Sequence, residues 1–143
     1  LSPVPGFAAW LKKERRTETG FLLDDERTVL AALDEPDWRA DAARTARVDK
    51  VLARAAARYF LTAKTSGNRP LDPVARFHLG NGARLERVNP GADLSDQGLA
   101  QSHGVMVNYL YDLSRIEDNH EAYAGRREVV ASPAVKKLSE RKG

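Results

Sequence analysis

The sequence predicts an α+β fold, with a helical segment over about residues 7–66 and a strand-containing segment over about residues 72–143. In the first segment, apolar residues recur at helical spacing, most clearly from Val48 to Tyr59. In the second, Val105, Val107, Tyr109, Tyr111 and Leu113 occupy alternate positions, and this mainly β-branched and aromatic pattern is typical of strands. No internal repeat or low-complexity linker interrupts the chain, so one domain is expected.

The composition is that of an ordinary globular domain and excludes several functions. Of the 143 residues, 42% are hydrophobic and 30% are charged, and the formal net charge is only +3. This excess is too small to indicate nucleic-acid binding, and no apolar run approaches the roughly 18–20 residues of a membrane span. Because cysteine is absent, disulfides and cysteine nucleophiles are excluded. With no signal peptide visible, we expect a cytoplasmic protein without membrane or nucleic-acid partners.

Three helices are expected in the first half of the chain. The first begins near Phe7, after an entry restricted by prolines. The second can be capped by Asp24 or Asp25 and should run through Leu33. The third is the longest, and Gly67 is a plausible C-terminal stop for it.

Four basic residues share one face of the long helix: Arg47, Lys50, Arg54 and Arg58. A stripe of this kind is usually a solvated face. The functional alternatives are a nucleic-acid surface, which would need interleaved aromatic residues, and an anchor for a phosphate-bearing ligand. Spacing alone does not choose between them.

The second half begins with a short capped helix. Asp72 is expected as its N-cap, with Pro73 at the first helical position, where the missing N–H costs nothing. The helix should reach about Leu79, and Gly80 can take the left-handed C-terminal position. The following Asn81-Gly82 pair is a turn that leads into a strand.

The remaining elements are short. The first strand is expected over residues 83–88, a helix over residues 95–102 and the second strand over residues 105–113. On that second strand, Asn108 and Tyr111 should lie on opposite faces. Ser114 and Glu117 form a capping box for a helix to about Ala124, and Ser132-Pro133 begins a terminal helix.

One of the three histidines is well placed for chemistry. His78 lies on the short helix directly before the turn, and imidazole titrates near neutral pH without special tuning. The alternative is a partly buried structural histidine. His103 and His120 form no paired metal-binding motif with it, so no metal site is expected.

Three segments, in their order and spacing, resemble the catalytic domain of malonyl-CoA decarboxylases: LSPVPGF at residues 1–7, DPVARFHLGNGARLERVN at residues 72–89 and GLAQSHGVMVNYLYDL at residues 98–113. The resemblance covers nearly the whole chain. It implies that Ser2 and His78 are catalytic and that Tyr111 lies in the active site and binds substrate. Without it, Ser2 would be interpreted as part of a proline-flanked turn and Tyr111 as a packed strand tyrosine.

The same resemblance implies the fold and the missing parts of the site. Members of the family have the fold of the GNAT acetyltransferases. Residues 1–143 are therefore expected to form the C-terminal part of the catalytic domain: a helical subregion, then the C-terminal part of a mixed sheet with flanking helices. The elements that hold the coenzyme A pyrophosphate, and an acidic partner for His78, are expected before Leu1. The 143-residue chain alone is thus expected to be inactive.

The activity that the resemblance implies is decarboxylation of malonyl-CoA to acetyl-CoA and CO2, a reaction of fatty acid metabolism. The substrate's own thioester accepts the electrons of the broken bond, so no cofactor is expected. The implied partners are malonyl-CoA and the upstream part of the same protein, and a homo-oligomer is left open. Family members usually differ at Pro90-Gly91 and at His103, beside the expected site, which bears on substrate fit.

Two other functions remain open from the sequence. A related acyl-CoA transferase would need an acceptor site for an amine, and no distinct acceptor motif is present. A noncatalytic helical interaction module would use the basic face from Arg47 to Arg58. Salt-sensitive nucleic-acid binding would indicate the latter.

Overall fold

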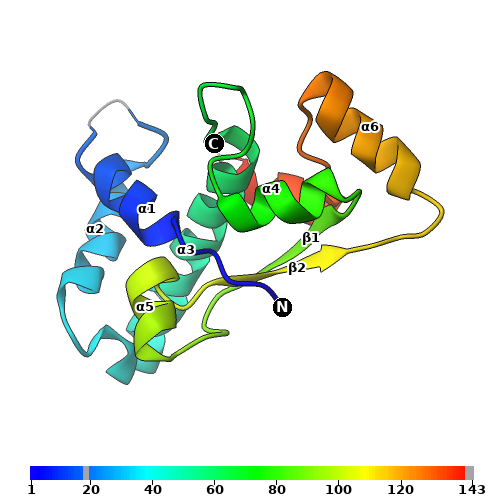
Figure 1. Cartoon of the computed structure of the whole chain (residues 1–143). Coiled ribbons are helices and arrows are strands. Elements are labelled where there is room, and N and C mark those ends of the chain that lie inside the picture. Colours follow the sequence, from blue (N-terminus) through cyan, green and yellow to red (C-terminus); the bar gives the residue numbers. More distant parts are fainter. Residues whose placement is uncertain (18–19, 141–143) are drawn as a thin grey trace.

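The computed structural model describes residues 1–17 and 20–140 and has the expected α+β architecture (Figure 1). Its described strands, β1 (Arg84–Asn89) and β2 (Met106–Leu110), form one antiparallel sheet. None of the described helices combines the length and apolarity that a bilayer crossing demands. The helical elements are α1 (Phe7–Arg15), α2 (Asp24–Leu30), η1 (Ala31–Asp34), η2 (Trp38–Ala40), α3 (Ala42–Thr62), α4 (Pro73–Gly80), α5 (Asp96–Ser102), α6 (Ile116–Arg126) and α7 (Pro133–Ser139).

Helix α3 supplies the centre of the hydrophobic core. Its buried face includes Val48, Leu52, Tyr59 and Phe60, each at most 1% exposed. Helices α1, α2 and α7 and strand β1 pack against it. Burying one side chain of leucine size stabilises a fold by about 1.5–3 kcal/mol. Because α1, α2, α7 and β1 all contact this face, it joins the N-terminal helices to the sheet. The apolar helix face predicted from the sequence is confirmed.

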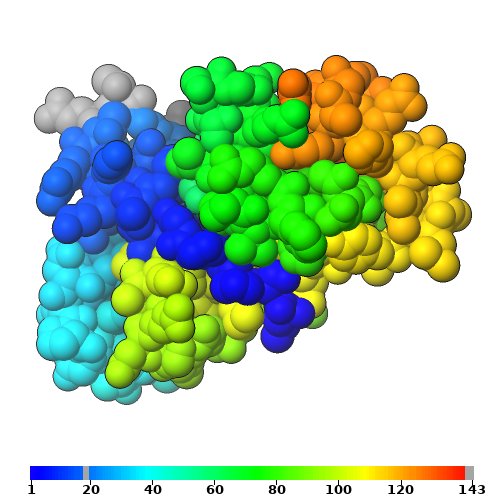
Figure 2. Space-filling view, in the orientation of Figure 1, coloured from blue at the N-terminus to red at the C-terminus, as the bar shows by residue number. Residues whose placement is uncertain are grey.

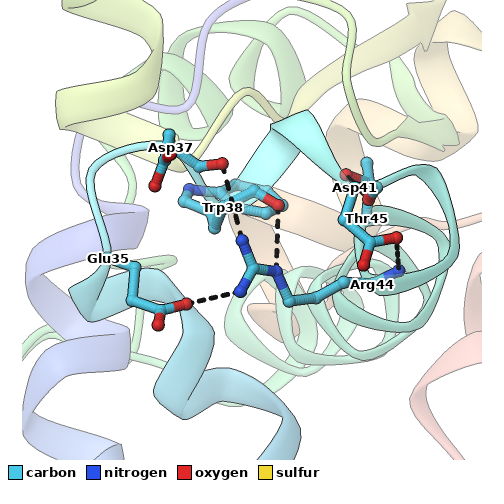
Figure 3. A network of polar contacts seen from close by, with 6 residues as sticks. All are labelled: Glu35, Asp37, Trp38, Asp41, Arg44 and Thr45. Carbon is cyan, nitrogen blue, oxygen red and sulfur yellow. Dashed lines mark hydrogen bonds and ion pairs between the residues drawn. The ribbon is translucent and has the colours of Figure 1, made fainter.

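Arg44 forms a network of hydrogen bonds with the connection between α2 and α3 (Figure 3). The Arg44 guanidinium donates to the Glu35 carboxylate at 2.6 Å. It also donates to the carbonyl oxygens of Trp38 at 3.2 Å and Asp37 at 3.5 Å. Asp41 caps α3 from the same segment. These bonds fix the start of the long helix, and the short helix η2 within the connection was not predicted.

Two helices end earlier than the sequence predicted. The second α-helix stops at Leu30 and tightens into the 3-10 helix η1, a common way to satisfy the last carbonyls of a helix. The third stops at Thr62 and not near Gly67. There the Ala63 carbonyl accepts a hydrogen bond from the Leu71 N–H at 2.9 Å, which draws the chain into a reversing loop.

The sheet is extended by a bridge on each outer edge. Strands β1 and β2 pair antiparallel, with a bulge between Leu85 and Arg87. Ser2 forms an antiparallel bridge with Val107 of β2, and Ala131 forms a parallel bridge with Leu85 of β1. A mixed sheet, with parallel and antiparallel pairs, was expected. Within the described ranges, the only parallel pairing is this bridge.

The second strand ends at Leu110, three residues before the predicted end. Asp112 accepts hydrogen bonds from the N–H and the hydroxyl of Ser114, at 3.1 and 2.7 Å. This local turn competes with extended pairing. It also removes Ser114 from the predicted capping position, so Arg115 is the N-cap of α6 and has no side-chain cap bond.

The predicted cap of the second helix is wrong: Leu23, not Asp24 or Asp25, is the N-cap of α2, and its N–H donates to the Glu26 carboxylate at 2.9 Å. Three other predicted caps are confirmed. Asp72, Ser95 and Ser132 each accept hydrogen bonds from the first turns of α4, α5 and α7. The end of α4 differs, because Gly80 is still helical and Gly82 takes the left-handed conformation, with φ at +87°. A Cβ atom at position 82 would lie 2.6 Å from the Ile116 carbonyl oxygen, so this close approach requires glycine.

Candidate active site

Helix α4 places His78 at its last turn, beside the N-terminal segment. Asp72 caps the helix at its start. At its end, the His78 carbonyl accepts hydrogen bonds from the N–H groups of Asn81 and Ala83, both at 3.1 Å. His78 is thus held by backbone bonds on both sides of the turn that leads into β1.

Ser2 reaches this histidine from the outer edge of β2. Its N–H donates to the Val107 carbonyl at 2.8 Å, and the Val107 N–H donates to the Ser2 carbonyl at 3.1 Å. Figure 2 shows the N-terminal segment (dark blue) on the surface, bordered by α4 (green) and α5 (yellow-green). The Ser2 Oγ lies 3.3 Å from the His78 Nε2.

Tyr111 contacts the other nitrogen of the ring. Its hydroxyl oxygen lies 2.6 Å from the His78 Nδ1. Because β2 ends one residue earlier, Tyr111 has left the sheet and its side chain is 41% exposed. Asn108 is engaged elsewhere: its Oδ1 accepts from the Asn89 Nδ2 at 2.8 Å. The strand tyrosine expected from the sequence is therefore a loop tyrosine.

Tyr109 is a contact that sequence reasoning missed. Its ring stacks on the His78 ring, with centroids 4.3 Å apart and planes inclined by 20°. Its hydroxyl is buried without a hydrogen-bond partner among the described residues, and burial raises the pKa of Tyr109. The available signal was the alternation that put Tyr109 and Tyr111 on one face of the predicted strand.

The electrostatics of the site favour a neutral histidine. Burial is the main cause that lowers the pKa of His78 below its ordinary value. A neutral imidazole has one N–H, so one ring nitrogen donates and the other accepts. When Tyr111 donates to Nδ1, the proton on Nε2 points to the Ser2 Oγ, and the Ser2 hydroxyl proton is left for a ligand.

Both ring nitrogens of His78 therefore have partners within the described chain. An acidic partner from outside it, as expected from the sequence, would have to share or replace the contact with Tyr111 or Ser2. The other histidines do not join the site. His103 packs edge-on against Phe7, and His120 Nδ1 contacts the Gly80 carbonyl at 2.8 Å. Residues 1–17 and 20–140 contain no group of side chains suited to hold a metal ion.

The basic stripe of α3 lies at a groove of about 710 Å³ between α2, α3, β1 and α7, whose lining does not include His78. The stripe is not a uniformly solvated face. Arg54 is only 11% exposed and donates to the Glu26 carboxylate at 2.8 Å, and Glu26 is itself 10% exposed. Arg58 lies over the Phe21 ring, 5.4 Å from its centroid. Arg47 and Lys50 are exposed and line the groove.

Comparison with known proteins identifies the family. The family described as "Malonyl-CoA decarboxylase C-terminal domain" matches the chain over residues 1–143. The chain belongs to the malonyl-CoA decarboxylase family. The mitochondrial malonyl-CoA decarboxylase of Anser anser anser is 34% identical to it, over 94% of this chain and 30% of the relative. That of Mus musculus is 34% identical, over 96% of this chain and 32% of the relative.

Solved structures of malonyl-CoA decarboxylases share the fold. The structure from Rhodopseudomonas palustris is 57% identical and superposes with a TM-score of 0.93, over 96% of this chain and 32% of that one. The structure from Cupriavidus metallidurans is 40% identical with a TM-score of 0.73, over 96% of this chain and 37% of that one. The chain thus spans about a third of the length of the curated relatives it matches.

The three residues expected to form a malonyl-CoA decarboxylase site meet at one imidazole. Ser2 and Tyr111 contact opposite nitrogens of His78. They come from three separate segments: the N-terminal segment, α4 and the loop after β2. The arrangement can move a proton between two hydroxyl groups through one ring.

Proposed function

We propose that the protein containing this chain decarboxylates malonyl-CoA to acetyl-CoA and CO2, and that Ser2 and His78 protonate the product. The observation that carries the proposal is the 3.3 Å contact between the Ser2 Oγ and the His78 Nε2, in a chain of the malonyl-CoA decarboxylase family. Residues 1–143 would form the C-terminal part of an acetyltransferase-like catalytic domain. The cytoplasmic location stays a prediction, and the goose and mouse relatives are named mitochondrial.

The proposed chemistry is a bond cleavage followed by a proton transfer. The bond between the carboxylate carbon and the α-carbon breaks, CO2 leaves, and the electron pair enters the thioester carbonyl as an enolate. A hydrogen-bond donor at that oxyanion contributes about 10²- to 10³-fold to the rate, and a general acid about 10²- to 10⁴-fold. The Ser2 hydroxyl would then give its proton to the α-carbon and receive the Nε2 proton of His78.

Tyr111 would complete this relay. A neutral His78 that gives up its Nε2 proton needs one at Nδ1, and the Tyr111 hydroxyl lies 2.6 Å away. Because Tyr111 is 41% exposed, it can regain a proton from water and can also border the acyl group of the substrate. The relay then runs from solvent through Tyr111, His78 and Ser2 to the α-carbon. It leaves His78 neutral with its proton on Nδ1, and proton exchange with solvent must return that proton to Nε2 before the next turnover.

The test is turnover by the full-length protein with malonyl-CoA and no added cofactor, followed as acetyl-CoA and CO2. We expect Ser2→Ala and His78→Ala each to lower kcat by about 10²- to 10⁴-fold while the fold is retained. Ser66→Ala and His120→Ala are matched controls, because both side chains are exposed. Full activity of the Ser2 and His78 variants would show that the site is elsewhere.

A further inference from the structure

A buried carboxylate lies where the segments of the site converge. Asp72 is 1% exposed. Its Oδ1 accepts hydrogen bonds from the N–H groups of Val74 and Ala75, both at 3.0 Å, which caps α4. Its Oδ2 accepts from the Tyr59 hydroxyl of α3 at 3.4 Å. Burial raises the pKa of Asp72, and the hydrogen bonds from Ala75, Val74 and Tyr59 oppose that rise.

These bonds join α3 and α4 at a single side chain, and the N-terminal segment packs against the same point. Gly6 ends the N-terminal segment that carries Ser2, Tyr59 belongs to the core helix α3, and Asp72 begins the helix that carries His78. The approach of the N-terminal segment is close: a Cβ atom at Gly6 would lie 2.7 Å from the Tyr59 hydroxyl oxygen. Both ends of the segment are therefore placed by contacts, at β2 through the Ser2 bridge and at the Tyr59 hydroxyl through Gly6.

The distance between the Ser2 Oγ and the His78 Nε2 is near the upper limit for a hydrogen bond. An oxygen and nitrogen pair hydrogen-bonds best at about 2.7–3.2 Å, and the contact weakens beyond that range. The Ser2 Oγ and His78 Nε2 are 3.3 Å apart, so a small shift of either segment breaks the contact. Misplacement of a catalytic group by about 1 Å can lower a rate by about 10²-fold.

We propose that Asp72 is a positioning residue, which sets the separation of Ser2 and His78 by capping α4 and by binding the Tyr59 hydroxyl of α3, against which the Ser2 segment packs at Gly6. The effect on kcat that we expect from this role rests on the proposed function. The separation itself can be measured whether or not the protein decarboxylates malonyl-CoA.

The decisive variant is Asp72→Asn in the full-length protein. Asparagine keeps the Oδ1 that caps α4 but presents an amide where Oδ2 accepts from Tyr59. Asp41→Asn is the matched control, because Asp41 caps α3 through the N–H groups of Ala43 and Arg44 in the same way. We expect Asp72→Asn to lower kcat by about 10- to 100-fold with little change in KM, and Asp41→Asn to change kcat by less than about twofold.

A double variant with Ser2→Ala distinguishes a positioning role of Asp72 from a general loss of structure. In a Ser2→Ala background, Asp72→Asn should lower kcat by no more than about twofold further, because the contact it positions is already lost. If the two effects multiply in full, or if Asp72→Asn behaves like Asp41→Asn, the proposal is wrong. Should Asp72→Asn fail to fold, Tyr59→Phe removes only the hydroxyl at Oδ2 and is expected to lower kcat by about 3- to 10-fold.

A crystal structure of the variant gives a readout that is independent of activity. The separation of Ser2 Oγ and His78 Nε2 should exceed its present 3.3 Å by about 0.5 Å or more in Asp72→Asn, or in Tyr59→Phe should the former not fold. An unchanged separation overturns the positioning role. If the wild-type protein shows no decarboxylation, the proposed function fails, and this distance alone decides the role of Asp72.

Discussion

The ring of His78 lies flat against the ring of Tyr109, with centroids 4.3 Å apart and an interplanar angle of 20°. His78 is thereby held in one plane while Ser2 and Tyr111 contact its two nitrogens. Stacking of this kind contributes about 0.5–1.5 kcal/mol beyond the area that it buries. The orientation of the imidazole therefore depends on packing as much as on hydrogen bonds.

The stack can be tested with two substitutions at Tyr109. Tyr109→Phe keeps the ring and removes a buried hydroxyl that has no partner among the described residues, so kcat should stay within about twofold and stability within about 1 kcal/mol. Tyr109→Leu removes the aromatic face and should lower kcat by about 10-fold or more, since His78 can then rotate. Steady-state kinetics and urea unfolding measure both. Equal kinetic loss in the two variants would assign the effect to the hydroxyl.

Removal of the Tyr111 hydroxyl should affect the proton supply of His78. In Tyr111→Phe, the Nδ1 loses the partner at 2.6 Å, and we expect kcat to fall by about 10- to 100-fold with the ring still bordering the site. The measurement is kcat and KM of the full-length enzyme across pH. A rise in KM at unchanged kcat would instead assign Tyr111 to substrate binding alone.

His103 should make the folded state sensitive to acid. Burial lowers the pKa of His103 to about 4, and the positive charge of Arg15 acts in the same direction. The unfolded state keeps the ordinary histidine pKa of about 6.5 and so binds a proton first. The free energy of unfolding is therefore unaffected by His103 above about pH 6.5 and falls as the pH drops towards the folded pKa, by about 3 kcal/mol in all.

Urea unfolding of wild type and His103→Asn at neutral pH and near the folded pKa measures this contribution. Asparagine tolerates the left-handed conformation of position 103, where φ is +53°. The wild type should lose about 3 kcal/mol more than the variant on acidification. Equal losses would mean that another group is responsible.

The turn after α4 should depend on glycine at position 82. Gly82 has φ at +87°, and a Cβ atom there would lie 2.6 Å from the Ile116 carbonyl oxygen, so Gly82→Ala should destabilise the fold by about 2–4 kcal/mol. Gly125→Ala is the matched control. A Cβ atom at position 125 would have the Glu121 Cγ as its nearest neighbour, 4.0 Å away, so alanine should stabilise α6 by up to about 1 kcal/mol. Denaturant unfolding distinguishes the two, and a neutral Gly82→Ala would contradict the close approach.

Several elements could be predicted because their causes are local. Asp72 and Ser132 cap helices with the side chain that the adjacent N–H groups require, and a following proline marks each first turn. The end of β2 could not be predicted, since periodicity continues to Leu113 while the bond from Ser114 to Asp112 ends the strand at Leu110. The pairing of Arg54 with Glu26 was hidden for a different reason, because those residues lie 28 positions apart.

For the candidate site, the sequence by itself determined the chemical groups: a serine followed by two prolines that restrict the backbone, a histidine on a capped helix and a pair of tyrosines. Only the tertiary structure decided that Ser2 and Tyr111 contact opposite nitrogens of His78, and that Tyr109 stacks against its ring. Caps and turns depend on neighbours a few residues apart, whereas these contacts depend on strand pairing and on burial of α3. A pattern along the chain does not encode such distances.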